Sequence, residues 1–122
     1  MTQANHQDAQ KLYGEAMDAA KQVMDLTRIM KRRAAKRIAE PMVRSSNSVC
    51  NNFLIAWQNR TDHKLFLEKL TAAITDAQAT RDRLNTAADA NEMPVEQTRQ
   101  VVATYDSLIA RLTELMNSMG TA

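Results

Sequence analysis

The sequence predicts an all-α protein, and the fold that we expect is an antiparallel up-down four-helix bundle. The 122 residues include two glycines and two prolines, so few positions interrupt a helix, and helix-favouring residues such as Ala, Leu and Gln are abundant. Apolar residues also recur at steps of three and four, which is the spacing of a helix that buries one face. We expect one domain, 1–122, with helices at about 8–31, 36–58, 61–88 and 94–119.

The first helix is predicted from an apolar stripe that ends in a basic run. The stripe consists of Leu12, Ala16, Ala19, Val23, Leu26 and Met30. No Gly or Pro separates Lys31 from Arg37, so this stretch is compatible with a turn or with a continued helix. Pro41 lacks a backbone N–H and clashes with the preceding turn, so it fits the first turn of the second helix or a kink.

The middle of the chain holds two more helices, divided by the polar run from Asn59 to Asp62. The second helix places Met42, Val49, Phe53 and Ala56 on one face, and the third places Phe66, Leu70, Ala73, Ile74, Ala77 and Leu84. Thr61 or Asp62 can accept a hydrogen bond from the first free amides of the third helix.

The second helix is unusually polar for a helix of a bundle. Its small polar residues are Ser45, Ser46, Asn47, Ser48, Asn51 and Asn52. Such side chains hydrogen-bond within the bundle or face a neighbouring subunit, and we favour these structural roles over contact with a ligand.

The fourth helix has a clear start and end. Pro94 suits the first helical position, where its missing N–H would be unpaired in any case, and Gly120 suits the end. Its apolar stripe is Val101, Tyr105, Leu108, Leu112, Leu115 and Met119. Methionines at helical spacing are core filler rather than cofactor ligands, so no cofactor is expected. These methionines are Met24, Met30, Met42, Met116 and Met119.

Positive charge is concentrated in one segment. Residues 28–44 hold seven bases against one acid, Glu40, and so carry +6, while the rest of the chain sums to −4. The bases are Arg28, Lys31, Arg32, Arg33, Lys36, Arg37 and Arg44. A local excess of this kind is typical of a surface that binds a polyanion, most often a phosphate backbone, and a solvated corner between helices is the alternative.

Several classes of function are excluded or disfavoured. A lone Cys50 forms no internal disulfide and no cysteine-built zinc site, and this fits a reducing, cytoplasmic setting. No apolar stretch is long enough to cross a membrane, and no signal sequence is recognisable. His6 and His63 lie in no catalytic or metal-binding pattern, so we expect neither an enzyme nor a metal protein.

The distinctive residues of the middle of the chain carry a resemblance. They form the pattern Arg44-x-x-x-Ser48-Val49-x-x-Asn52-Phe53, followed by Arg60-Thr61 and Leu70-x-Ala72. The pattern resembles the four-helix-bundle proteins encoded in intervening sequences of bacterial 23S ribosomal RNA genes, which have an R-x-x-x-S-I-x-x-N-I stretch, then R-S and A-x-G-S. The chain departs from that family at Cys50, where a proline is frequent, and at Ile55-Ala56, which replace an acid-glycine pair.

The resemblance implies a non-enzymatic bundle that assembles as a ring-shaped homo-oligomer, a pentamer. A related branch of the family serves as the accessory protein of diversity-generating retroelements, beside a reverse transcriptase and its template RNA. The basic charge of residues 28–37 is closer to that branch than to the ribosomal one.

Two functional hypotheses follow. The first is an oligomeric accessory protein whose basic rim contacts the phosphates of structured RNA or an RNA/DNA hybrid. Its expected contact residues are Arg28, Lys31, Arg32, Arg33, Lys36, Arg37, Arg44 and Arg60. The second is an adaptor whose basic rim docks an acidic protein, such as a polymerase, without holding nucleic acid. A monomeric bundle with a solvated basic corner is the plainer alternative.

Overall fold

Four long helices account for most of the chain. The computed structural model describes residues 6–30 and 35–120, and within these residues no strand forms. The helices are α1 (His6–Arg28), α3 (Glu40–Gln58), α4 (His63–Asp89) and α5 (Val95–Gly120), and a short π-helix, η1 (Ala35–Ala39), leads directly into α3. The predicted all-α chain with four long helices is therefore confirmed.

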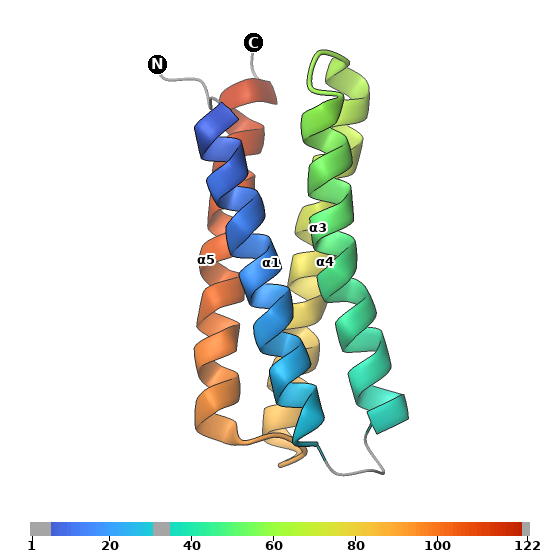
Figure 1. Cartoon of the computed structure of the whole chain (residues 1–122), viewed down its shortest axis with the longest axis vertical. Coiled ribbons are helices and arrows are strands. Elements are labelled where there is room, and N and C mark those ends of the chain that lie inside the picture. Colours follow the sequence, from blue (N-terminus) through green and yellow to red (C-terminus); the bar gives the residue numbers. More distant parts are fainter. Residues whose placement is uncertain (1–5, 31–34, 121–122) are drawn as a thin grey trace.

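The helices lie side by side around one apolar core (Figure 1). α1 packs against α3 and α5, and α4 packs against the same two helices from the other side. The turn between α3 and α4 lies at the same end of the bundle as the start of α1 and the end of α5. We call the other end the η1 end, because it holds the last turn of α1, η1 and the loop between α4 and α5.

The predicted apolar stripes form the core. Among the largest side chains with almost no exposed surface are Tyr105, Phe53, Phe66, Met42 and Leu70, drawn from three helices, and Val23 of α1 joins them. The interpretation of Met24 as core filler is wrong, since 41% of its surface is exposed. Val23 faces the core, and the next residue of a helix points about 100° away from it.

The helix boundaries follow local chemistry. Pro41 lies in the first turn of α3. The sequence allowed either this position or a kink, because proline has no backbone N–H to donate. The α4 helix is capped by Asp62, whose carboxylate accepts a hydrogen bond from the Leu65 amide at 3.1 Å. After α4, Asn91 adopts a left-handed conformation with φ of 56°, which Asn tolerates better than most residues.

Two of the small polar residues of α3, Ser45 and Asn52, hydrogen-bond across to α4. The Ser45 and Thr80 hydroxyls are 2.6 Å apart, and the Asn52 amide donates to the Asp76 carboxylate at 3.0 Å. Residues 45 and 52 ascend α3 while their partners, 80 and 76, descend α4, so these two helices run in opposite directions. Ser45 and Thr80 are buried, and their hydroxyls also bond to the Met42 and Asp76 carbonyls of their own helices, so both are satisfied where water is excluded.

One buried hydroxyl lacks such a partner. The Tyr105 phenol is fully buried and makes no hydrogen bond to the described residues. Burial raises its pKa above the ordinary value of 10.0, and the nearby Cys50 thiol adds to the rise. The Ser46 hydroxyl opposes this pKa shift, but the pair lacks hydrogen-bonding geometry, so burial decides the direction.

Replacing the cap of α4 should destabilise the protein. Asp62→Ala leaves the Leu65 amide without its acceptor and should lower the free energy of unfolding by about 1 kcal/mol, as measured by urea denaturation. Asp62→Asn, which keeps an acceptor oxygen, should lose only a small part of this. An equal loss in both variants would contradict the capping role.

Stability should also fall at high pH because of Tyr105. The folded protein holds the phenol proton more tightly than the unfolded chain does, so the stabilisation is complete below pH 10.0 and is lost as the pH rises above it. Tyr105→Phe should therefore show a flatter decline in the free energy of unfolding above pH 10.0 than the unsubstituted protein. Parallel declines would show that Tyr105 is not responsible.

Candidate nucleic-acid interface

The structure brings four of the predicted phosphate-binding residues to the η1 end or to the part of α3 that follows it. Arg28 lies in the last turn of α1, Lys36 and Arg37 lie in η1, and Arg44 lies on α3. All four side chains are exposed. Lys31, Arg32 and Arg33 lie outside the described residues.

Most of this charge is not neutralised by neighbours. Arg28 pairs with Asp25 at 3.5 Å, but both side chains are more than half exposed, and pairs of that kind contribute little. Lys36, Arg37 and Arg44 have no ion-pair partner among the described residues. Their charges are therefore available to an external anion.

The fold also brings acids to the η1 end, which we did not expect from the sequence. The α4–α5 loop lies there with Asp89 and Glu92, and Glu96 follows in the first turn of α5 (Figure 1). Residues 25–44 hold seven bases and two acids, and residues 81–99 hold three bases and four acids, so the two segments together carry +4. The predicted alternation of helix direction was the signal that could have revealed this, because an up-down arrangement places the first and third connections at one end.

Part of that acidic charge is already paired. The Arg99 guanidinium binds the Asp89 carboxylate at 2.9 Å and the Asn85 side-chain oxygen at 2.8 Å. These contacts hold the start of α5 against the end of α4. The η1 end thus presents the unpaired bases of η1 and, at the same end, a loop whose charges are partly neutralised.

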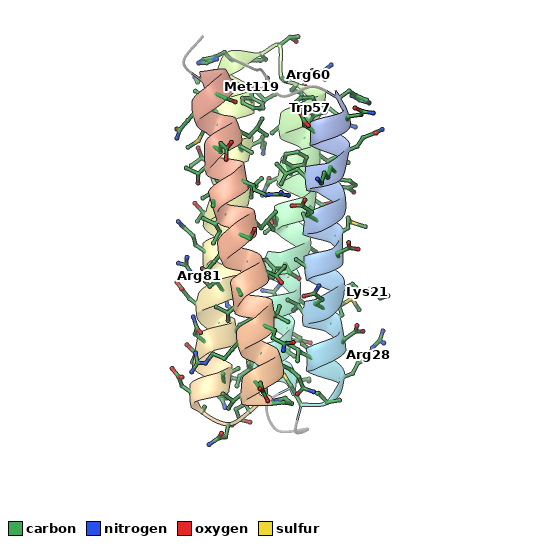
Figure 2. All side chains as sticks on the ribbon, turned by 90° about the vertical axis from the view of Figure 1, so that its left-hand side faces the viewer. Lys21, Arg28, Trp57, Arg60, Arg81 and Met119 are labelled. Carbon is green, nitrogen blue, oxygen red and sulfur yellow. The ribbon has the colours of Figure 1, made fainter. Side chains whose placement is uncertain are left out.

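The structure separates Arg60 from the other predicted contact residues. Arg60 and Trp57 lie near one end of the bundle, and Arg28 lies near the other (Figure 2). The Arg60 guanidinium stacks 4.8 Å from the centre of the Trp57 ring and donates to the Trp57 backbone oxygen at 3.0 Å. It thereby covers the Trp57 ring and satisfies a carbonyl in the last turn of α3.

No other chemistry stands out in the described part of the chain. It contains no group of three or more His, Cys, Asp and Glu side chains able to hold a metal ion. Burial raises the pKa of the Cys50 thiol, which disfavours the reactive thiolate. Within the described ranges, no helix is long and apolar enough to cross a membrane.

Comparison of the sequence with known protein families finds a match. Residues 8–114 match the family model described as 23S rRNA-intervening sequence protein. The chain belongs to this family. The match includes the whole of residues 28–44 and the Arg60 position, and it confirms the family resemblance found in the sequence. Searches of curated proteins and of solved structures find no match.

The family description refers to an intervening sequence of the 23S rRNA and names no activity. Membership in the family therefore assigns no role to any residue of the η1 end. The exposure, charge and pairing of the side chains carry the functional argument.

Arg60 should contribute to stability rather than to binding at the η1 end. Arg60→Ala removes the stacked guanidinium and should lower the free energy of unfolding by about 1 kcal/mol in urea denaturation. Trp57 is the only tryptophan of the chain, and its fluorescence should shift to longer wavelength as water reaches the ring. Unchanged fluorescence and stability would contradict this role.

Proposed function

We propose that this protein is a non-catalytic, cytoplasmic accessory protein that binds the phosphates of structured RNA or an RNA/DNA hybrid through its η1 end. The observation that carries the proposal is the exposed, unpaired state of Lys36 and Arg37 in η1. Arg28 and Arg44 extend the basic surface on either side, and Lys31, Arg32 and Arg33 belong to the same stretch of sequence. Counterion release from phosphates is the expected driving force.

The position of these bases on their helix supports a binding role. Lys36 and Arg37 precede α3 in a continuous run of helix, at the end where backbone N–H groups point outward and the dipole is positive. Basic side chains are unfavourable for helix stability at that position, where Asp and Glu are preferred. An anion that accepts from both the side chains and the helix end would offset this cost.

We further propose an up-down bundle that assembles into a ring, a pentamer by the family resemblance. A ring would present the η1 end of every copy on one rim and would strengthen weak individual phosphate contacts through multivalency. A reverse transcriptase of a retroelement is the protein partner that the resemblance favours, because a template RNA accompanies such an enzyme.

A second candidate function is favoured by the acids of the η1 end. Asp89, Glu92 and Glu96 give this end both signs of charge, a pattern that suits a protein surface better than a uniform polyanion. In this case the protein is an adaptor that docks a partner protein and ignores free nucleic acid.

Charge reversal in η1 should separate these functions. The double variant Lys36→Glu with Arg37→Glu should bind structured RNA roughly 10- to 100-fold more weakly at low salt. The slope of log affinity against log salt should decrease by about two, one for each phosphate that the variant no longer neutralises. Electrophoretic mobility titrations at two salt concentrations provide the measurement.

A control with the same change in charge is available at the opposite end of the bundle. Lys11 on α1 and Lys64 on α4 are exposed lysines, and Lys11→Glu with Lys64→Glu should keep RNA affinity close to that of the unsubstituted protein. Equal losses of RNA affinity in both double variants would show that net charge alone is responsible, and this would overturn the proposed site. Absence of RNA binding by the unsubstituted protein would favour the adaptor.

A further inference from the structure

The outer face of α3 is uncharged over an unusual length. Residues 45–59 contain no Asp, Glu, Lys or Arg. Those of the outer face, which we call the amide face, are Asn47, Asn51, Leu54, Ile55 and Gln58, and all five are exposed. Leu54 and Ile55 are 37% and 36% exposed. Helix faces that remain in water are normally rich in charge, so this face has the composition of a covered surface.

A groove runs along the opposite part of the molecule, between α1 and α5. Two hollows of about 530 and 520 Å³ lie next to each other there, since Gln22 and Thr104 line both. Figure 2 views the bundle from the side on which α5 and α1 lie nearest to the reader. Ile29 contributes exposed apolar surface to one hollow, and the nearly buried Leu26, Val101 and Leu108 line the hollows beneath.

The two walls of this α1–α5 groove differ in chemistry. The α1 wall carries Asp18 and Asp25, which are seven residues apart and so lie on one side of the helix. The α5 wall carries Gln100, Ala103 and Ser107, and at one end of the groove its Arg111 forms an ion pair with Glu15 of the α1 wall. Between that ion pair and Gln100, the small side chains of Ala103 and Ser107 leave room for a helix to approach. The groove therefore suits an uncharged polar helix that carries a base near one end.

We infer that the amide face of one copy docks into the α1–α5 groove of a second copy. The lengths agree, since Asn47 to Gln58 spans about 17 Å of helix and Gln97 to Arg111 spans about 21 Å. Amide side chains line both surfaces and can pair as donors and acceptors.

Charge complementarity supports the same pairing. Arg44 lies two helical turns before Asn51 on the amide face and has no ion-pair partner among the described residues. Asp18 of the groove is likewise exposed, and no ion pair within the described ranges includes it. In this interface Arg44 contacts the second copy rather than a phosphate. Lys36 and Arg37 remain to bind the anion.

The interface joins two different surfaces, so each copy has one face and one groove to offer. Such head-to-tail contacts form a ring when the rotation closes and a filament when it does not. The inference rests on the assembly part of the proposed function, and Arg44 is the one residue that it takes from the proposed nucleic-acid surface.

Cysteine cross-linking tests the pairing directly. Asn51→Cys places a thiol on the amide face and Ser107→Cys places one in the groove, while the native Cys50 is buried. A mixture of the two single variants should form a disulfide-linked dimer under mild oxidation. The chain carrying both substitutions should form a ladder of covalent multimers that stops at the ring size. Gln78→Cys, on the exposed side of α4, replaces Asn51→Cys in the matched control and should give no such dimer with Ser107→Cys.

The outcomes distinguish this inference from the proposed function. Cross-linking of Asn51→Cys with itself, or equal cross-linking in the Gln78→Cys control, would overturn the pairing of face with groove. An oligomeric protein, established by light scattering, that forms no mixed dimer would overturn the interface and leave the ring. A monomeric unsubstituted protein would overturn both the ring and the interface, and RNA binding would still be decided by the η1 variants.

A charge inserted into the interface gives a second measurement that needs no cross-link. Asn51→Glu brings a carboxylate toward the acidic α1 wall of the groove and should shift the mass measured by light scattering toward the 13.7 kDa monomer. Gln78→Glu makes the same kind of change on α4 and should leave the mass unchanged. Persistence of the full assembly in Asn51→Glu would contradict the inference.

Discussion

The hydrogen-bonded contact between α3 and α4 sets the register on which the rest of the structure depends. Ser45 with Thr80 and Asn52 with Asp76 are the polar pairs of this contact, and a slip of one helix along the other would separate both pairs. With that register set, the α3–α4 turn lies at one end, and the start of α3 meets the end of α4 at the other. The electrostatic character of the η1 end follows from this meeting.

Because the connection from α4 to α5 brings Asp89, Glu92 and Glu96 there, the η1 end differs from the uniformly basic rim that residues 28–44 indicate by themselves. The bases of η1 remain exposed at the end that also holds the acidic α4–α5 loop, so a bound polyanion would contact a limited strip of the surface. A mixed surface is also more selective than a uniformly positive one, because an approaching anion must avoid the acids to reach the bases. The charges of the η1 end therefore influence the orientation of a bound polyanion as well as the affinity for it.

Much of the fold could be predicted because it depends on local chemistry. The cap at Asp62 and the position of Pro41 in the first turn of α3 follow from the hydrogen-bonding capacity of a few neighbouring residues. The candidate site was predictable only in part. Arg60 is separated from the other bases because α3, with 19 residues, is about 28 Å long and carries it to the opposite end. Sequence proximity to a basic segment did not reveal that separation.

The sequence alone determined the helices, their apolar stripes and the basic segment, because helix periodicity and end-capping act over a few residues. Only the tertiary structure decided which side of each helix remains in water. Met24 is exposed although its spacing permits burial, and the uncharged face of α3 and the groove between α1 and α5 appear only once the helices are packed. Exposure is a property of neighbouring helices far apart in the chain, and periodicity along one helix does not specify those neighbours.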